Sequence, residues 1–425
     1  MDVLESQLHI VIKNKAPKWI DFLVRLIQIP SVFGKEQACQ KLVQTAMEEI
    51  GIFERIVYPP NTQAGVMNEI GGCVIGRIPG MGVRQPFILN ANIDTAPVEN
   101  PASWKYPPFA GIIEDGKLYG RGALDDKAGI AMLLLLAETM MESGVKLPGD
   151  IIFESVIEDE NSGDGTLACT QAGYQAGAAV IIDGTWPFRI IEGHLGQMWL
   201  EVEVRGTPTA ACNVKRAIDP VSGAMDFVEA VRNLLAAKNE GKFWQGLEAP
   251  YFCCLGSIQA GVWAGAVPES CALALQVGFC PPETPQSMLE EIESAAKKSA
   301  SGNKVSITVR PGSLFTPPFI NSQNLMVRIL SSAIERLRPG QMEVKPVTVT
   351  GHCDLRHLLK ADGSMTDACL YGPGGGANPH CANEYYILEH FVPVAQNIMS
   401  SILQYYHLVT IPSPSYAHGV NICAV

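Results

Sequence analysis

Near its start the chain repeats apolar residues with the period of a helix. Five of them recur at i, i+3, i+4, i+7 and i+8: Trp19, Phe22, Leu23, Leu26 and Ile27. This spacing predicts a helix with one apolar face, and Pro30 ends it because proline cannot continue a helix. A second helix is predicted from about 36 to 50.

Short apolar runs and helical patterns then alternate along the chain. The runs that predict strands are 72–78, 87–92, 151–157 and 178–182. A longer run, 130–136, reads as a buried helix. Because strands and helices alternate, we expect an α/β fold with a mostly parallel sheet flanked by helices.

From residue 199 the strands become polar on one face. Leu200, Val202 and Val204 alternate with charged residues, as in a strand that is exposed on one side. The predicted order is then strand, helix, strand, strand, helix, strand, which is the split βαβ order of a ferredoxin-like α+β domain. This domain spans roughly 195–312 and interrupts the first one.

After residue 317 the α/β pattern returns. It predicts a helix at 325–337, strands at 344–349 and 369–371, and a closing helix at about 388–406. We therefore expect one α/β domain built from residues 1–194 and 313–425, with residues 195–312 inserted into it.

Composition restricts the class of protein. A chain of 425 residues is too long for one ordinary core, and 47% hydrophobic with 17% charged residues is typical of a globular protein. The net charge of -12 argues against nucleic-acid and anionic membrane partners, because phosphate binding requires a basic face. Small molecules or peptides are the expected partners, with no nucleic acid and no membrane.

The cysteines and the apolar runs bear on the compartment. Twelve cysteines are scattered without a CxxC pair, which favours neither a thiolate zinc site nor a disulfide framework. Residues 1–15 lack the apolar core and cleavage site of a signal peptide, and no apolar run is long enough to cross a bilayer. We expect a reducing, cytoplasmic location.

Polar and acidic residues gather where predicted strands end or helices begin. Five separate segments carry them: Asn92 with Asp94, Asp125, the acidic run Glu158, Asp159 and Glu160, Asp183, and His380. Each segment alone is also explained as a turn, a helix cap or a solvated acidic loop. If the segments meet, carboxylates and imidazole would suit Zn, Mn or Co, in one site or in two that share a carboxylate.

Together these motifs resemble the co-catalytic zinc metallopeptidase family that includes carboxypeptidase G, aminoacylase-1, acetylornithine deacetylase and succinyl-diaminopimelate desuccinylase. The resemblance rests on Ile29-Pro30-Ser31, Asp94-x-x-Pro97, Gly120-Arg121-Gly122 with Gly129, the acidic run, the inserted domain and the 372–380 loop. It covers nearly the whole chain. It implies a zinc-binding catalytic domain and a small lid domain through which such proteins often form homodimers.

The resemblance also implies roles for single residues. Asp125 matches the carboxylate that bridges two metals, and Glu160 and His380 match the other ligands of one of them. Asp183 matches a ligand of the second metal. Asp94 matches the carboxylate that orients a ligand.

Substrate contacts are expected from the later part of the chain. Arg356 looks like the residue that grips a substrate carboxylate, because a planar guanidinium suits bidentate binding; a structural ion pair is the alternative. The glycine-rich loop with Gly375 and Asn378 would bring backbone close to a ligand. His352 stands near Arg356 in the sequence and is a further candidate.

Five positions depart from the family pattern. Asn92 stands where the family has a metal-binding His, and Asp159 aligns with its general-base Glu. Ala210 aligns with the lid His that polarises the scissile carbonyl. Gly265 and Gly278 replace a lid Asn and a lid Arg.

These departures have unequal consequences. Because an amide is a poor zinc ligand, the half-site of Asp125 and Asp183 should be weak or empty, so one ion is expected rather than two. Asp159 is one methylene shorter than Glu, and a misplacement of about 1 Å can cost on the order of a hundredfold in rate. Loss of a donor to the oxyanion costs a similar factor.

Two hypotheses follow. In the first, the protein is a metal-dependent amidohydrolase or peptidase for an N-acyl amino acid or small peptide with a free carboxylate, and Asp159 or Glu158 takes a proton from water. In the second, it is a catalytically impaired relative without hydrolytic activity. It would then bind a ligand or serve non-hydrolytic acyl chemistry, with or without a metal.

Overall fold

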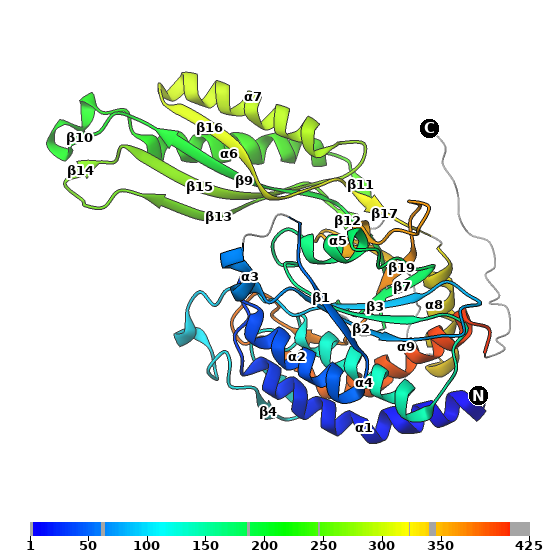
Figure 1. Ribbon diagram of the computed structural model, residues 1–425. Coiled ribbons are helices and arrows are strands. Elements are labelled where there is room, and N and C mark those ends of the chain that lie inside the picture. The colour runs from blue at the N-terminus through cyan, green and yellow to red at the C-terminus, as the bar shows by residue number, and fades with distance from the viewer. Residues whose placement is uncertain are drawn as a thin grey trace.

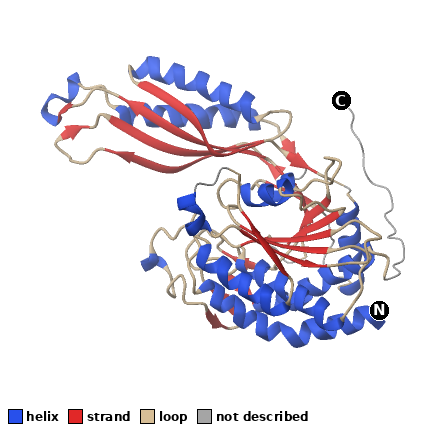
Figure 2. Ribbon diagram, viewed as in Figure 1, coloured by secondary structure: helices blue, strands red, loops and turns tan. Residues whose placement is uncertain are grey.

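The computed structural model shows a larger α/β body and a smaller body formed by one sheet and two helices (Figures 1 and 2). It describes residues 3–60, 64–184, 188–244, 247–322, 324–339 and 346–408. Val344, at the start of one predicted strand, lies outside these residues.

The larger body is organised around one twisted sheet. In spatial order its strands are β1 (Phe53–Val57), β2 (Cys73–Ile78), β6 (Ile151–Val156), β3 (Phe87–Asn92), β7 (Ala178–Ile181), β19 (Asp367–Leu370), β8 (Ile191–His194) and β17 (Phe319–Ile320), and β18 (Val347–Val349) pairs with β8. The central strands β6, β3, β7 and β19 are mutually parallel, and antiparallel pairs lie toward both edges. The prediction of a mostly parallel central sheet is confirmed.

Helices bury both faces of this sheet. They are α1 (Val3–Ile27), α2 (Gln37–Ile50), α3 (Ala64–Ile70), α4 (Lys127–Ser143), α5 (Asp164–Gln171), α8 (Leu325–Leu337) and α9 (Phe391–Tyr405). In Figure 1, α1, α2, α4 and α9 gather below the sheet and α5 lies above it. Strands β3 and β6 are buried along their whole length, which explains why they are continuous apolar runs.

Some elements differ from the sequence-based expectation. Helix α1 begins at Val3, far ahead of the predicted stripe, because Leu8, Ile12 and Ala16 extend the same buried face. Strand β1 and helix α5 were not predicted. Among the described helices, none has the length and apolar character that crossing a bilayer requires.

The smaller body has the predicted ferredoxin-like order. Its elements are β9 (Gly196–Arg205), α6 (Pro220–Asn239), β13 (Phe252–Ala260), β15 (Ser270–Phe279), α7 (Pro285–Asn303) and β16 (Ser306–Thr316), and the sheet order is β13-β15-β9-β16. Its buried residues, from Leu195 to Val305, form a core of their own. The domain boundaries at 194/195 and 312/313 stay a prediction.

Smaller sheets extend these bodies. Strands β4 (Ile112–Glu114), β5 (Lys117–Tyr119), β20 (Gly376–Ala377) and β21 (Tyr385–Ile387) form a four-stranded sheet in the order β20-β21-β5-β4. Strands β10 (Thr209–Ala210) and β14 (Ala266–Val267) pair at the free end of the smaller body. The first of these sheets carries the loop of His380, so it helps to build the site.

Candidate metal centre

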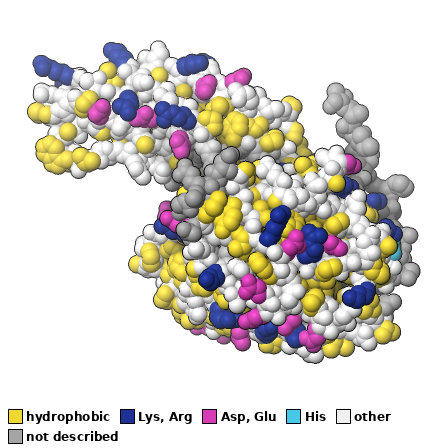
Figure 3. Space-filling view, viewed as in Figure 1, with side chains coloured by type: hydrophobic (Ala, Val, Ile, Leu, Met, Phe, Trp, Pro, Cys, Tyr) yellow, Lys and Arg dark blue, Asp and Glu magenta, His cyan; other side chains and the backbone are white. Residues whose placement is uncertain are grey.

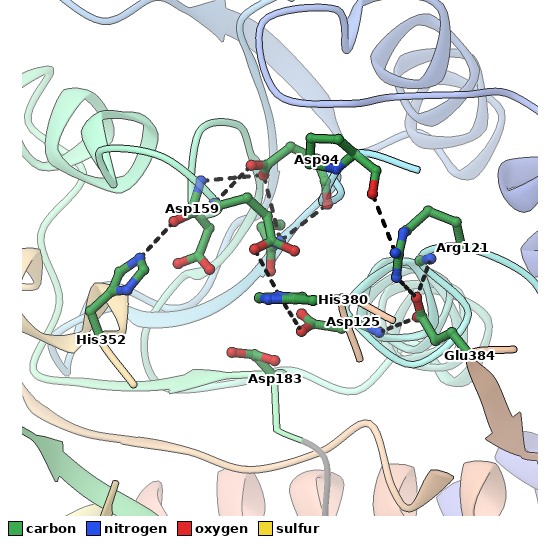
Figure 4. Close-up of polar contacts among 12 residues, drawn as sticks. Asp94, Arg121, Asp125, Asp159, Asp183, His352, His380 and Glu384 are labelled. Atoms are coloured by element: carbon green, nitrogen blue, oxygen red, sulfur yellow. Dashed lines mark hydrogen bonds and ion pairs between the residues drawn. The ribbon is translucent and has the colours of Figure 1, made fainter. Parts of the chain in front are cut away.

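Three residues from distant segments converge at the carboxyl end of the central strands. Asp125 lies in the turn before α4, Glu160 in the turn after β6, and His380 in the loop between β20 and β21. The Nε2 atom of His380 is 3.1 Å from Oδ2 of Asp125 and 2.9 Å from Oε2 of Glu160 (Figure 4). One ligand atom from each residue lies within 4.8 Å of the other two. Their role as metal ligands stays a prediction, but the necessary geometry is present.

The electrostatics of this group suit a cation. Hydrogen bonds to Asp125 and then to Glu160 raise the pKa of His380 to about 12, so the two carboxylates already attract positive charge to this point. Burial, followed by repulsion from Asp125, raises the pKa of Glu160. Its Oε1 is buried without a hydrogen-bond partner in the described structure. A divalent cation would satisfy this oxygen and neutralise the repulsion, so the donor set fits a metal.

The residues of the predicted second half-site lie beside this group without joining it. Asp183 approaches Asp125 and His380 in Figure 4, and its Oδ1 accepts the N–H of Gly184 at 2.5 Å. Burial, and then repulsion from Asp125, raises the pKa of Asp183 well above its usual range. Asn92 is buried, and its Nδ2 lies 3.5 Å from Oδ1 of Asp94. The amide nitrogen is therefore turned toward Asp94.

Asp94 holds the segment that carries Asp159 and Glu160. It is fully buried, and its two oxygens accept the backbone N–H groups of Asp159 at 3.3 Å and Glu160 at 2.9 Å. Burial, followed by repulsion from Asp159, raises the pKa of Asp94. Asp94 thus orients a candidate ligand through the backbone.

Both candidate bases, Glu158 and Asp159, lie on the acidic turn, residues 158–163, and their surroundings differ. Glu158 has a positive φ of 67°, and its Oε2 accepts a hydrogen bond from Asn161 Nδ2 at 2.6 Å. Asp159 has no such partner on its own turn. Burial, and then the neighbouring Glu160, raises the pKa of Asp159 to about 7. A carboxyl group with this pKa can exchange a proton near neutrality, so Asp159 is the better placed of the two.

Arg356 is engaged with its own surroundings. Its Nη1 donates to the carbonyl of Cys353 at 2.6 Å, and its Nη2 donates to the carbonyl of Ser162 at 3.0 Å. It also lies 3.8 Å from Asp354, and only 10% of its side chain is exposed. In this arrangement Arg356 anchors the acidic turn, and its predicted role toward a substrate carboxylate stays untested.

The other predicted substrate contacts also have structural partners. The N–H of Gly375 donates to Nδ1 of His390 at 3.0 Å, and Nδ2 of Asn378 donates to the carbonyl of Asn383 at 3.2 Å. His352 lies against the acidic turn, with Nε2 at 2.9 Å from the carbonyl of Asp159. Of the three, His352 contacts the acidic turn, and the binding roles of all three stay predictions.

The departures in the smaller body have a structural setting. Ala210 is exposed on β10, at the free end of that body. At Gly278 a Cβ atom would meet the ring of Phe252 at 2.0 Å, and at Gly265 it would meet the ring of Trp263 at 2.3 Å. Aromatic rings therefore occupy the space that an Asn or Arg side chain would need.

One functional element escaped the sequence analysis. Glu384 is fully buried and accepts hydrogen bonds from Nη1 of Arg121 at 2.6 Å and from the backbone N–H groups of Gly122, Leu124 and Asp125. Figure 4 shows it behind Asp125, on the side away from His380. The only sequence feature that pointed to Glu384 is its position shortly after the loop of His380. Nothing in the sequence indicated that it pairs with Arg121.

The sequence is similar to a known peptidase family and to individual known proteins. A family model described as peptidase family M20/M25/M40 matches residues 88–404. The N-formyl-4-amino-5-aminomethyl-2-methylpyrimidine deformylase of Bacillus subtilis is 26% identical over 381 residues, which cover 80% of this chain and 88% of that protein.

Solved structures share the fold. The dipeptidase Dug1p of Saccharomyces cerevisiae superposes with a TM-score of 0.78 at 13% identity, covering 95% of this chain and 99% of that one. The YXEP protein of B. subtilis, described as a dinuclear metal-binding peptidase, gives a TM-score of 0.63 at 17% identity, with 93% and 100% coverage. These likenesses confirm the α/β fold with a mostly parallel central sheet, and the smaller body is consistent with them.

Proposed function

The chain belongs to peptidase family M20/M25/M40, and we propose that it is a metal-dependent amidohydrolase that cleaves an N-acyl amino acid or a small peptide. The convergence of Asp125, Glu160 and His380 carries this proposal. These residues supply the oxygen and nitrogen donors that a hydrolytic metal site needs.

Zinc is the proposed ion, with manganese or cobalt as alternatives. When bound, it supplies Lewis-acid chemistry that polarises the amide carbonyl and makes a neighbouring water more acidic. Asp125, Glu160 and His380 would hold one ion. We propose one rather than two because Asn92 offers only an amide and Asp183 already accepts the Gly184 N–H, whereas the YXEP protein is described as dinuclear.

The proton steps belong to residues of the acidic turn. Asp159 takes a proton from the attacking water and returns it to the nitrogen of the leaving amine, a task that suits its raised pKa. Asp94 holds the backbone of Asp159 during both steps. Glu158 is less suited, because Asn161 occupies one of its oxygens.

The substrate class divides into two candidates. A free carboxylate on the substrate would bind Arg356, which requires the guanidinium to leave the carbonyls of Cys353 and Ser162. A formamide without a carboxylate would leave Arg356 in place, and the B. subtilis relative is described as a deformylase. The carboxylated substrate is our primary proposal. The hydrogen bonds of Arg356 to the carbonyls of Cys353 and Ser162 favour the formamide.

The alternative role is a catalytically impaired protein that binds ligands or serves non-hydrolytic acyl chemistry. Asn92, Asp159 and Ala210 support it, since each replaces a group that the family pattern uses. The geometry of the metal ligands supports the hydrolase instead, because a ligand-binding protein has no need of that donor set.

Metal analysis and a substrate panel test these proposals together. Protein purified without chelator should contain about one metal ion per chain and hydrolyse members of a panel of N-acyl amino acids, dipeptides and formamides. Chelator should abolish turnover, and added zinc should restore it. Protein that contains no metal and yet binds a panel member would establish the impaired relative. Each N-acyl amino acid is paired with its carboxamide, and an equal rate on both would exclude a carboxylate contact.

We also propose that the protein forms a homodimer and that it works in a reducing compartment. Strand β13 forms the edge of its sheet and is largely exposed, so its backbone can pair with another strand. Val262 and Trp263 are exposed in the adjoining loop, and apolar side chains gather at this end of the smaller body in Figure 3. Light scattering of the protein and of Ile258→Lys, on the same strand, tests this interface: the variant should be monomeric.

A further inference from the structure

Two polar bridges join the smaller body to the acidic turn, and one of them is hydrogen-bonded along its whole length. They begin on the strands by which the chain enters and leaves that body, at Gln197 on β9 and at Ser313 on β16. Both end on the turn that carries Asp159 and Glu160. The smaller body is thereby connected to the site, although none of its side chains belongs to the group of metal-binding candidates.

In the first bridge, the amide of Gln197 has one orientation. It is buried, its Nε2 donates to the carbonyl of Thr350, and its Oε1 accepts a hydrogen bond from Gln276 at 2.9 Å. A flipped amide would set two oxygens against each other at Thr350. Its Oε1 is therefore the atom that faces Nδ1 of His352 at 3.3 Å.

His352 carries this bridge to the site. Its Nε2 lies 2.9 Å from the carbonyl oxygen of Asp159, which can only accept a hydrogen bond. Both ring nitrogens thus face acceptors, and a neutral imidazole has one N–H. The shorter contact assigns that N–H to Nε2. Nδ1 then carries no hydrogen, so its contact with Oε1 of Gln197 is a packing contact and not a hydrogen bond.

The second bridge reaches the same turn from β16. The hydroxyl of Ser313 donates to Oδ1 of Asn161 at 2.5 Å, and Nδ2 of Asn161 donates to Glu158. The carbonyl of Glu158 accepts the N–H groups of Asn161, Ser162 and Gly163, so these residues form a closed turn. If β16 is displaced, we therefore expect the whole turn to move with it as one unit.

The remaining contacts of the turn come from the larger body. Asp94 accepts the N–H groups of Asp159 and Glu160, and Arg356 donates to the carbonyl of Ser162. Loss of a bridge should therefore loosen the turn without unfolding it. This distinguishes a positioning contact from one on which folding depends.

We propose that Ser313 and Asn161, through hydrogen bonds, and Gln197 and His352, through packing, are positioning residues that make the placement of Asp159 and Glu160 depend on the position of the smaller body. The proposal goes beyond the proposed function, because the same coupling would act in a hydrolase and in a ligand-binding relative.

Amide hydrogen exchange of the full-length protein tests the coupling without a substrate. The variants are Ser313→Ala and Gln197→Met, which remove one bridge each. The control is Ser306→Ala, on the same strand as Ser313 and also exposed. We expect exchange of the amides at 161–163 to rise by roughly three- to tenfold in Ser313→Ala, the effect of losing one hydrogen bond, and by less in Gln197→Met, which removes only a packing contact. The control should leave it unchanged.

Zinc titration by calorimetry gives a second measurement. Because Glu160 moves with the turn, Ser313→Ala should bind zinc a few-fold more weakly than Ser306→Ala, and Gln197→Met should lie between the two. Exchange at 161–163 that stays unchanged in the double variant, with the melting temperature preserved, would overturn the proposal. If Gln197→Met lowers the melting temperature of the protein, the exchange result for the exposed Ser313→Ala alone decides whether the coupling exists. A protein that binds no zinc would contradict the proposed function, and the exchange result would still decide the coupling.

Discussion

Glu384 accepts the backbone N–H of Asp125 at 3.2 Å, although the two residues lie 259 positions apart in the chain. The same carboxylate binds the guanidinium of Arg121, and both side chains are almost fully buried. Because Glu384 lies in the segment that follows His380, it fixes the turn of one candidate ligand against the loop of another. The geometry of the candidate metal site therefore depends on a residue that would bind no metal itself.

Replacement of Glu384 by Gln should be strongly destabilising. Arg121 would stay buried without a charged partner, and breaking one side of a buried pair typically costs about 3–5 kcal/mol. Urea denaturation should show this loss, and zinc should bind more weakly to the folded fraction. Glu389→Gln is the control, because 81% of that side chain is exposed. Equal stability of the two variants would refute the role of Glu384.

Asp159→Asn should lower kcat by about 10²–10⁴-fold, the usual range for loss of a general base. Glu158→Gln should retain most activity, because Asn161 already binds the Glu158 carboxylate. The assay uses whichever amide the substrate panel identifies. A larger loss in Glu158→Gln than in Asp159→Asn would assign the base to Glu158 instead.

Metal content should distinguish the ligands of one ion from those of two. Asp125→Asn should remove the metal, whereas Asp183→Asn should retain about one ion per chain, because only Asp125 belongs to the converging group. Mass spectrometry of metals in the purified variants measures this directly. Two ions in the unchanged protein, with one lost in Asp183→Asn, would instead support a dinuclear site.

Stability should fall as pH rises from about 4.5 to 8, partly because of Glu154. Burial raises the pKa of this carboxyl from 4.5 to about 8, so in this range the folded protein holds a proton that the unfolded chain has released. The contribution is at most about 1.4 kcal/mol per pH unit. Glu154→Gln should flatten this dependence in denaturation measured at pH 5 and pH 8. The exposed Glu99→Gln should keep the original slope, and an unchanged slope in Glu154→Gln would contradict the assignment.

Periodicity was sufficient for elements with a strong apolar pattern. Strands β3 and β6 and helix α4 are buried almost entirely, so their runs of apolar residues identified them. Strand β1 has only one buried residue, and helix α5 consists largely of small and polar residues, so neither has a clear period. Their position depends on tertiary contacts that a local pattern does not contain.

The site was predictable to a different degree. The family resemblance predicted that Asp125, Glu160 and His380 form one group. In the structure, one ligand atom from each lies within 4.8 Å of the other two. It could not show that Arg356 donates to two backbone carbonyls, because those partners are set by the path of the chain. The pairing of Glu384 with Arg121 was inaccessible for the same reason.

The interrupted layout of the larger body has a consequence for biosynthesis. On the ribosome, Asp125, Glu160 and Asp183 emerge before the smaller body, whereas His380 and Glu384 emerge after it. A nascent chain that has not reached His380 holds mutually repelling acids without the imidazole that lies between Asp125 and Glu160. The proposed ion could therefore bind all three candidate ligands only after His380 has been synthesised, and a product that ends before His380 lacks one of them.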